Sequence, residues 1–544
     1  MIRSRARVGA RLIAAAATFS LVLTGCGKIE DSGGQQPQQP ADQDTRPIKT
    51  GGTLRFALDA EPDKLDPTLS RTLVGREVFQ SICETLYEVD EKLEIVPKLA
   101  ASLPEVSQDG KTVTIKIRTG LKFADGTTMD AAAVKTSLDR HRTLTGSARK
   151  SELGPITEIT VADPATVTIK LAEPYAPLTG SLTASGGIVM SPTALASGKD
   201  FATAPVCIGP FKFATRVAQD RIEVVKDPNY YDADKVKLDK IIYRTIPDAT
   251  TRLNNLRSGD IDVMLTVSPI NVDELKADGN LRLIANDSIG YQGITINIGN
   301  AAGKTSDPAP LAAPFASPLS TDARVRRALM LSIDREALNR TVFRGVYTPA
   351  CGPISPASPL SSDAAQACPP HDPAQAKRLL AEAGVATPVK VSLTVINNAD
   401  GKRIGEAIKS MATEGGFDIQ LEPVEFASAL DAVDAGRYQM FRIGWSGLVD
   451  ADGNISQFFQ TKGSQNTSGY TNPEVDAWLT EARRSQDVNK RRELYGKVIT
   501  KIHEDVPIIY LYRTKNQIGV SNKVGQVRMF NDYLVRLATA GFVE

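Results

Sequence analysis

Histidine and cysteine are scarce in this sequence, with 3 His and 5 Cys in 544 residues. The histidines His141, His371 and His503 are far apart and no CxxC pair occurs, which argues against a zinc-type metal site. The formal net charge is only +1, and a nearly neutral chain is not typical of a nucleic-acid-binding protein. No second long apolar run follows residue 23, so no membrane-spanning helix is expected in the rest of the chain.

The N-terminus has the pattern of a bacterial lipoprotein signal. Arginines at positions 3, 5, 7 and 11 precede an apolar run over residues 12–23, and the string LTGC ends at Cys26. The run is too short to span a bilayer stably, and small residues before the cysteine admit processing enzymes. We expect a signal peptide over 1–25, a lipid on Cys26, and a mature chain held at the extracytoplasmic face of the cell membrane. The alternative is an ordinary secretory signal with an incidental cysteine.

Residues 26–50 are predicted to be a flexible tether. They are rich in Gln, Pro, Gly and Asp and have almost no apolar side chains, so they cannot build a core. A flexible segment of this length has an end-to-end distance of about 25–30 Å, which is enough to hold a domain clear of the lipid head groups. The four N-terminal arginines supply +4 of the formal charge, so the mature part carries −3.

Four cysteines follow Cys26, an even number that can pair in an oxidising compartment. We expect Cys351 to pair with Cys368, because the Pro- and Ser-rich stretch between them has no periodic apolar face. Closing a loop of that size stabilises a fold by about 3 kcal/mol. Cys83 and Cys207 then pair by elimination. The alternative is four buried thiols.

The globular part alternates strand and helix periodicities. Residues 112–118 alternate apolar and polar side chains, as a half-buried strand does. Residues 372–384 begin with a capping aspartate and a proline and end with a glycine, which marks both ends of a helix. A strand over 389–395, a helix over 401–414 and a strand over 417–421 imply parallel pairing. The predicted fold class is α/β, with two or three globular units in a chain of this length.

One short string permits an enzymatic interpretation. Ser147 and Lys150 fit the Ser-x-x-Lys pattern of penicillin-recognising acyl transferases. So loose a pattern arises often by chance in a chain this long, and a solvated loop after a helix is the simpler interpretation. A serine–lysine surface hydrolase is therefore kept only as a rival hypothesis, and we predict no catalysis.

A series of strings matches one protein family in that family's order. DGK at 109–111 is followed by LKFADG at 121–126 and AVKTSLDR at 133–140. The later matches are GPFKF at 209–213, NYY at 229–231, LRSGDID at 256–262, RVRRAL at 324–329, IDR at 333–335, the helix at 372–384 and GW at 444–445. This set resembles the extracytoplasmic solute-binding proteins of peptide and nickel ABC importers, family 5. The resemblance extends over residues 51–544.

The resemblance implies a two-lobed, type II periplasmic-binding-protein-like fold with an extra subdomain on the first lobe. Transferred to this chain, lobe I comprises 51–90, 206–298 and 515–544, the extra subdomain 91–205, and lobe II 299–514. The ligand is expected between the lobes. A ligand that touches both lobes binds the closed form better, and so shifts the population towards the state that a permease recognises.

The segment after Gly444 departs from the pattern of the peptide-binding relatives. In those relatives an aspartate three residues after the Gly-Trp tryptophan holds the ligand's α-ammonium, because a buried cation must be paired. Here that position is Leu448. The segment instead resembles the branch of the family with Gly-Trp-Ser-Gly followed by Asp-x-Asp-Gly-Asn, whose ligands are diverse.

The same segment supplies most of the predicted ligand-binding residues. Trp445 is predicted as a wall or stacking surface, Asp450 or Asp452 as the partner of a cationic or hydroxyl-bearing group, and Arg442 as a carboxylate partner. Trp445 as a core aromatic and 452–454 as a plain turn are the alternatives.

Three further residues complete the predicted site. Ser446 follows the tryptophan directly. Tyr291 and Asn297 flank an apolar alternation that we interpret as the strand crossing into lobe II, which would place them near the cleft.

These patterns together predict a membrane-anchored substrate-binding lipoprotein of an ABC importer that captures short peptides or similar polar solutes, with no cofactor and no metal. Because of Leu448, a metal chelate, an opine or a sugar conjugate is the alternative ligand. The expected partners are the ligand, an ABC permease and the membrane through the lipid anchor, without nucleic acid, and the protein is expected to be a monomer. A receptor that signals without transport is a further alternative.

Overall fold

The computed structural model describes residues 44–544. The predicted signal peptide over 1–25, the lipidation of Cys26 and most of the tether lie outside the described residues. In the part of the chain that the structure describes, no helix is long and apolar enough to cross a bilayer.

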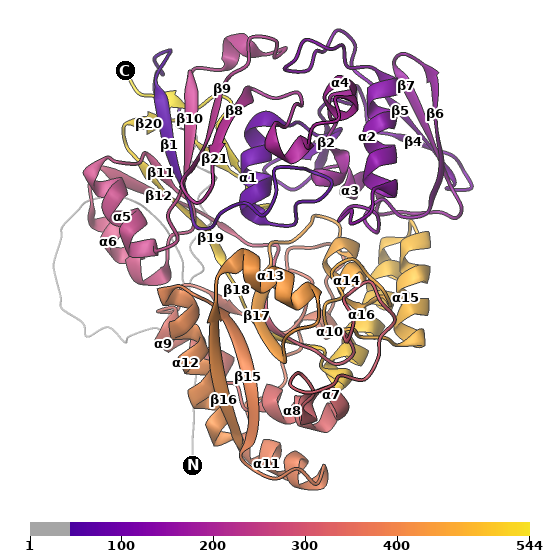
Figure 1. Ribbon diagram of the computed structural model, residues 1–544, viewed down its shortest axis with the longest axis vertical. Helices are drawn as coiled ribbons and strands as arrows, with labels where there is room; N and C mark the ends of the chain where they lie inside the picture. The colour runs from indigo at the N-terminus through magenta and orange to yellow at the C-terminus, as the bar shows by residue number, and fades with distance from the viewer. Residues whose placement is uncertain (1–43) are drawn as a thin grey trace, which may run out of the picture. The chain divides into compact units, whose positions relative to one another are not determined.

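A seven-stranded mixed sheet organises the first lobe (Figure 1). In sheet order its strands are β12 (Leu281–Asp287), β19 (Lys515–Ser521), β11 (Val263–Met264), β1 (Thr53–Leu58), β10 (Lys240–Thr245), β9 (Arg221–Lys226) and β8 (Phe211–Val217). The first strand, β1, pairs in parallel with β10 and β11, and the other pairs are antiparallel. The helices of this lobe include α1 (Leu73–Ile82), α5 (Ala249–Ser258) and α6 (Val272–Ala277).

A smaller antiparallel sheet lies within the range predicted for the extra subdomain. Its order is β4 (Glu105–Val106), β5 (Thr112–Lys116), β7 (Thr166–Leu171) and β6 (Ile156–Asp163), and α2 (Ala131–Thr143) packs against β6 and β7. The strand predicted at 112–118 is confirmed as β5, which buries Val113 and Ile115. One hydrophobic core runs through this sheet and the seven-stranded sheet. The small sheet is therefore packed onto the first lobe rather than separated from it.

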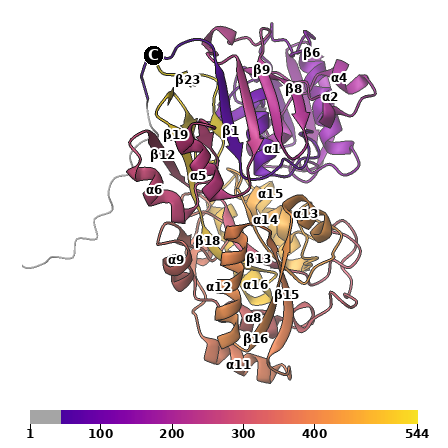
Figure 2. The same ribbon diagram turned by 60° about the vertical axis from the view of Figure 1, so that its left-hand side comes forward.

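A six-stranded sheet organises the second lobe, visible in the lower half of Figure 1. Its order is β14 (Thr348–Pro349), β18 (Ile508–Arg513), β13 (Tyr291–Ile296), β17 (Met440–Trp445), β15 (Val389–Ile396) and β16 (Phe417–Val424). The predicted strand–helix–strand unit is confirmed: β15 and β16 pair in parallel, and α12 (Ala399–Glu414) connects them and packs against both. Figure 2 shows α12 running beside these strands.

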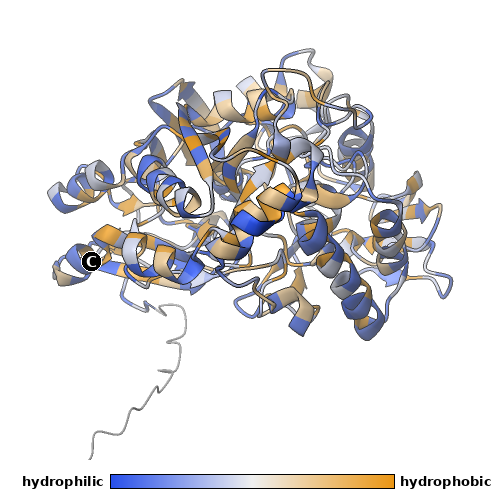
Figure 3. Ribbon diagram, turned by 90° about the horizontal axis from the view of Figure 1, so that it is seen from below, coloured by the Kyte–Doolittle hydropathy of each residue, from blue (hydrophilic) through white to orange (hydrophobic). Residues whose placement is uncertain are grey.

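The remaining helices of the second lobe are amphipathic and cover the six-stranded sheet and a second cluster of buried residues. The predicted helix at 372–384 is confirmed as α11 (Pro373–Glu382), whose first turn is capped by the Asp372 carboxylate. Figure 3 shows hydrophobic and hydrophilic residues side by side on such helices. The others are α8 (Ala323–Leu331), α9 (Arg335–Val342), α13 (Phe426–Asp434), α14 (Asp452–Phe459), α15 (Pro473–Arg484) and α16 (Val488–Asp505).

The short elements complete the secondary structure. The helices are α3 (Leu178–Ser181), α4 (Pro192–Ala196), α7 (Pro318–Thr321) and α10 (Asp363–Gln366). The strand pairs are β2 (Tyr87–Val89) with β3 (Ile95–Pro97), β20 (Val524–Gly525) with β23 (Gly541–Phe542), and β21 (Arg528–Met529) with β22 (Val535–Arg536).

The chain passes between the two large sheets at two adjacent crossings. β12 ends at Asp287 and β13 begins at Tyr291, while β18 and β19 are separated by residue 514 alone. The crossing strands are paired on both sides, β12 with β19 and β13 with β18. Buried Arg513 also donates to the carbonyl of Gly290 (2.6 Å) and so joins the crossings directly. The predicted end of lobe I at 298 lies beyond the first crossing, because β13 belongs wholly to the second sheet.

The four cysteines of the described chain form two disulfides, in the connectivity expected from the sequence. Cys83 is bonded to Cys207 and Cys351 to Cys368. The first bond joins the end of α1 to the segment that precedes β8. The second closes the Pro- and Ser-rich loop beside α10.

Candidate ligand-binding site

A cavity of about 480 Å³ lies between the two large sheets. Its lining comes from both lobes, including Asp59, Arg252 and Tyr533 on the first and Arg442 and Trp445 on the second. The volume is within the range of sites for small organic ligands, which is about 300–1,000 Å³. We call this interlobe cavity the cleft.

Trp445 and Ser446, two of the residues predicted to bind the ligand, line the cleft. Trp445 is the last residue of β17 and is half-buried. Its indole Nε1 donates to the Asn454 side chain (2.9 Å), and its ring meets Phe458 edge to face. Ser446 Oγ accepts from the Arg76 guanidinium of the first lobe (3.2 Å). The indole is thus fixed by its own lobe, whereas the hydroxyl joins the two lobes.

Asn454 organises the turn that carries the tryptophan, and sequence reasoning did not assign it this role. Besides binding the indole, its side chain accepts from the backbone N–H of Leu448 (2.7 Å) and donates to the carbonyl of the same residue (2.9 Å). Residues 452–454, which could have been a plain turn, begin α14. Leu448 is buried and does not line the cleft. The only sequence signal for Asn454 was its spacing from the tryptophan.

Arg442 also lines the cleft and lies on β17, the strand that ends at Trp445. Its Nη2 donates to the Tyr512 hydroxyl, and its Nε is buried without a partner. Within residues 44–544 no carboxylate forms an ion pair with this guanidinium. A half-buried guanidinium with spare donors is well suited to an anionic group, because Arg binds carboxylates through two parallel hydrogen bonds.

Asp450 and Asp452 do not line the cleft, so their prediction as ligand partners is corrected by the structure. The Arg491 guanidinium binds Asp450 at 2.6 and 3.0 Å, and Arg483 binds both oxygens of Asp452 at 3.0 Å. Tyr495 adds a further hydrogen bond to Asp452 (3.2 Å). Both carboxylates are therefore neutralised within lobe II by arginines of α15 and α16.

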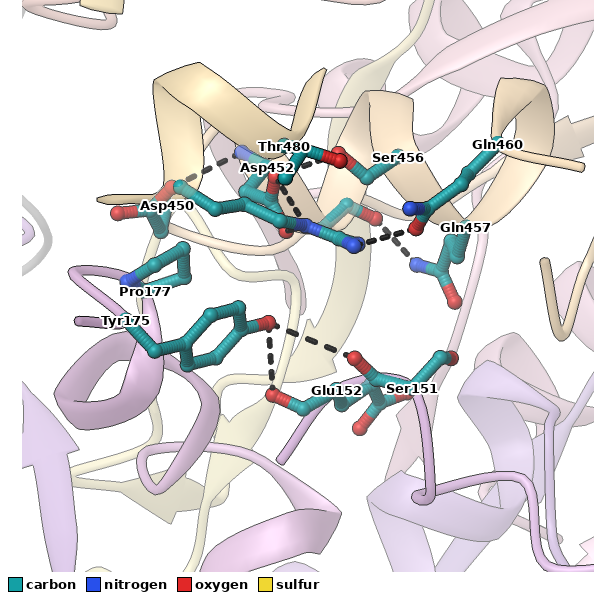
Figure 4. Close-up of polar contacts among 12 residues, drawn as sticks. Ser151, Glu152, Tyr175, Pro177, Asp450, Asp452, Ser456, Gln457, Gln460 and Thr480 are labelled. Atoms are coloured by element: carbon teal, nitrogen blue, oxygen red, sulfur yellow. Dashed lines mark hydrogen bonds and ion pairs between the residues drawn. The ribbon is translucent and has the colours of Figure 1, made fainter. Parts of the chain in front are cut away.

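These ion pairs instead support a contact between the lobes, seen in Figure 4. The Arg483 guanidinium lies 5.8 Å from the centre of the Tyr175 ring, and the backbone carbonyl of Arg483 accepts from the backbone N–H of Ala176 (2.8 Å). The Tyr175 hydroxyl donates to the carbonyl of Glu152 (3.2 Å). We call Tyr175, Asp450, Asp452, Arg483 and Arg491 the paired edge. Nearby, Ser151 donates to Ser464 across the lobes (2.7 Å).

Tyr291 and Asn297 also lie outside the cleft, which corrects their predicted role. Tyr291 packs edge to face against Tyr510 and Phe458 in a buried cluster, and burial raises the pKa of its hydroxyl. The Asn297 amide donates to the carbonyl of Gly436 (3.0 Å) and accepts from the N–H of Asn300 (2.9 Å). Both side chains are occupied by the fold, while other residues of β13 face the cleft.

A second interlobe contact at the cleft has no counterpart in the sequence motifs. Arg71 of the first lobe binds Asp434 of the second (2.7 Å), and Lys304 binds the other oxygen of the same carboxylate (3.1 Å). Burial, followed by the charge of Arg71, lowers the pKa of Lys304 to about 8, and Asp434 opposes that shift. The Lys304 ammonium is therefore poised near physiological pH.

Neither alternative chemistry is assembled in the described chain. The Ser147 hydroxyl donates to the carbonyl of His141, and Lys150 is exposed, with no hydrogen bond joining the two side chains of the proposed hydrolase. Among residues 44–544 no group of three or more His, Cys, Asp or Glu side chains is placed to hold a metal ion.

Comparisons with known proteins agree with the two-lobed architecture. The model of bacterial extracellular solute-binding proteins, family 5 Middle, matches residues 94–466. The glutathione-binding protein GsiB of Pectobacterium atrosepticum is 29% identical over 513 residues, covering 92% of this chain and 96% of that protein. The PBP AgaA from A. tumefaciens R10, solved with agropinic acid, is 27% identical, with a TM-score of 0.81 and coverage of 91% and 99%. The fold is also shared with the periplasmic binding protein DppA of Helicobacter pylori, solved with the peptide STSA (23% identity, TM-score 0.80, coverage 91% and 99%).

Proposed function

The chain belongs to family 5 of the bacterial extracellular solute-binding proteins, and on that premise we propose that it captures a short peptide or a similarly sized polar solute for an ABC importer. The observation that carries the proposal is the cleft, which is lined from both lobes and has the volume of a small organic ligand. The ligand is bound and released unchanged. It is then delivered to the permease of the importer.

Three residues of the second lobe contact the ligand in this proposal. Trp445 stacks on a planar or apolar part of the solute, Ser446 offers a hydroxyl, and Arg442 pairs with a carboxylate. The position of all three in the cleft supports these roles. Because the Trp445 indole is already held by Asn454, little side-chain freedom is lost when a ligand stacks on it.

Closure of the lobes couples capture to delivery. The contacts of Arg71 with Asp434 and of Arg483 with Ala176 exist only when the lobes are together. A ligand that touches both walls of the cleft binds this closed form better than an open form and shifts the population towards it. The permease then recognises the closed form.

We also propose that the protein works as a monomer at the extracytoplasmic face of the membrane, held by a lipid on Cys26 and a tether that ends near residue 50. The support is the LTGC string behind an apolar run and the polar composition of residues 26–50. Replacing Cys26 with serine is expected to release the protein from the membrane fraction while leaving ligand affinity unchanged. Retention of C26S in that fraction would contradict the anchor.

A non-peptide ligand is the second candidate, favoured by Leu448 at the position where peptide-binding relatives carry an aspartate. The relative AgaA was solved with agropinic acid. A metal chelate, an opine or a sugar conjugate therefore stands beside the peptide as a ligand for this cleft.

The sequence contains only two tryptophans, which permits a selective test. Trp478→Phe leaves Trp445 as the only tryptophan, so its emission reports directly on the cleft. We expect saturable quenching of W478F by members of a di- to pentapeptide library, or by glutathione, with a stoichiometry of one by calorimetry. The matched variant Trp445→Phe keeps Trp478 on α15 and is expected to show no such response.

Two results would overturn the proposal. Silence of wild-type protein towards the peptides and glutathione would reject the peptide ligand in favour of the second candidate. Chemical conversion of a captured compound, detected by mass spectrometry after release, would reject the role as a binding protein.

A further inference from the structure

Six carboxylates line the cleft, and five of them are already engaged by the protein. They serve as ion-pair partners or as helix caps, so their charges or lone pairs are satisfied without a ligand. The engaged carboxylates and their partners are Glu61 with Arg216, Asp248 with Thr251, Asp400 with Arg403, Glu425 with Ser428 and Asp434 with Arg71. Within residues 44–544 Asp59 alone among the six has neither a hydrogen bond nor an ion pair.

The five cationic side chains of the cleft divide in the same way. Arg71, Arg403 and Lys515 pair with Asp434, Asp400 and Asp287. The terminal nitrogens of Arg252 donate to the carbonyls of Ile246, Pro247 and Thr266. Among the cationic groups that line the described cleft, Arg442 is left with a phenol hydroxyl as its only partner.

Asp59 is placed by the first strand of the sheet. β1 ends at Leu58, so Asp59 follows at the carboxyl end of the strand and is half-buried in the wall of lobe I. The charge of Asp59 acts on Arg252, whose pKa it helps to raise against the effect of burial, but the two do not form an ion pair. Burial raises the pKa of the Tyr533 hydroxyl, and the charge of Asp59 adds to that rise.

We infer that Asp59 is the group that recognises a cation on the ligand, and that the ligand is a zwitterion whose ammonium or guanidinium faces lobe I while its carboxylate faces Arg442 on lobe II. This inference rests on the proposed function, because it concerns the same cleft. In the described cleft, a carboxylate without a partner on one wall and a guanidinium without an anionic partner on the other match a solute with one group of each charge. Since each charged end engages a different lobe, both ends favour the closed form.

An anionic partner in lobe I also fits the presence of Leu448, whose apolar side chain cannot pair with a ligand cation. The carboxylates next to it in the sequence, Asp450 and Asp452, are bound by Arg491 and Arg483 and cannot take a ligand cation. The second lobe therefore offers no available carboxylate in the segment that follows Trp445. An ammonium group brought into the cleft still needs an anionic partner, and Asp59 is the carboxylate that remains.

A test compares ligand forms rather than absolute affinities. Pools of synthetic di- to pentapeptides are offered in free, N-acetylated and C-amidated forms to W478F protein, with binding read from Trp445 emission and captured peptides identified by mass spectrometry. We expect free peptides to bind about 10–100-fold more tightly than N-acetylated ones, as a hydrogen-bonded charge predicts. Asp59→Asn should abolish that preference and keep the preference for free over C-amidated peptides. Arg442→Met should do the reverse.

Glu425→Gln is the comparator, because it removes another carboxylate charge from the same cleft. It should keep both preferences. An Asp59→Asn variant that still discriminates against acetylated peptides, or a Glu425→Gln variant that loses the same preference, would overturn the inference. Wild-type binding without any preference for a free amine would overturn the inference while sustaining the proposed function. Failure of all three pools to bind wild-type protein would overturn both.

Discussion

Two regions of the molecule, the cleft and the paired edge, differ in whether their charged side chains have partners within the protein. Among the residues that the structure describes, Arg442 and Asp59 of the cleft have no charged partner in direct contact, whereas Asp450 and Asp452 of the paired edge each bind an arginine. Only a short segment separates Arg442 from Asp452 in sequence. The arginines that decide the difference come from α15 and α16, far along the chain. Whether a charge is available to a ligand depends on those distant partners.

The contrast has an energetic side. A buried ion pair contributes little net stability, but losing one partner leaves an uncompensated charge and costs several kcal/mol. Arg442 and Asp59 are half-buried, and neither has a charged partner among the described residues that a substitution would leave unpaired. Substitutions at the paired edge should therefore affect stability, and substitutions in the cleft should affect affinity.

The largest expected effect is on the paired edge. Asp452→Asn leaves the Arg483 guanidinium without a carboxylate, and we expect the free energy of unfolding to fall by about 3–5 kcal/mol. Denaturant unfolding of the mature protein, followed by circular dichroism, measures the loss. The double variant Asp452→Asn/Arg483→Met should lose less than the sum of the single variants, because the isolated charge is gone. Full additivity would remove the distinction between the two regions.

Arg442→Met is the corresponding change in the cleft. We expect affinity for a carboxylate-bearing ligand to fall about 10–100-fold, since a charge-assisted hydrogen bond is lost. The free energy of unfolding should change by less than about 1 kcal/mol, because no buried carboxylate loses its partner. Trp445 emission in the W478F background gives the affinity and urea unfolding gives the stability. A large loss of stability with unchanged affinity would reverse the assignment.

Lys304 tests the second interlobe contact, in which its ammonium binds Asp434 of the cleft wall. Its pKa is about 8 in the closed structure, below the ordinary value of 10.5, and Arg71 of the other lobe is one of the causes. An open form that separates these charges binds the proton more tightly, so closure releases a proton and is favoured as pH rises through 8. Between pH 7 and 9 affinity should increase by up to about tenfold relative to Lys304→Met, which cannot titrate. A constant ratio between the two proteins across this range would contradict the coupling.

The smallest expected effect concerns a neutral contact across the lobes. Ser151→Ala removes the hydrogen bond to Ser464, and we expect affinity to fall by about two- to fivefold, as for a single neutral hydrogen bond. Ser147→Ala is the matched control, because that hydroxyl binds only its own lobe at the carbonyl of His141. Equal effects of the two variants would show that the Ser151 contact does not contribute to closure.

The fold was largely predictable because its signals are local. The alternation over β5 and the cap of α11 depend on neighbouring residues, and the order of the family motifs indicated the two-lobed fold. The crossing at residue 514 coincides with the predicted boundary between 299–514 and 515–544, whereas the predicted boundary at 298 lies after the first crossing. The apolar alternation of β13 runs on to residue 298, past the three residues at which the chain changes sheets.

The site was predictable only in part. Trp445, Ser446 and Arg442 were identified from one motif and line the cleft. The pairing of Asp450 and Asp452 with arginines could not be predicted, because those arginines lie too far along the sequence to be recognised as partners from neighbouring residues.

Tyr291 failed for a different reason. β13 is a central strand with β17 and β18 on either side, so apolar periodicity does not reveal which face meets the cleft. Asp59 left no signal at all, since a single aspartate after a strand fits any turn.

The two crossings are adjacent and are joined by Arg513, so they form a single hinge between the lobes. We therefore expect motion of one lobe relative to the other to be a rotation about the line that joins the crossings. In Figure 1, α15 lies well away from β18 and β19, and so far from the crossings. Because α15 lies far from the crossings, a small rotation about them would separate Arg483 from Tyr175 more than it would move Arg513.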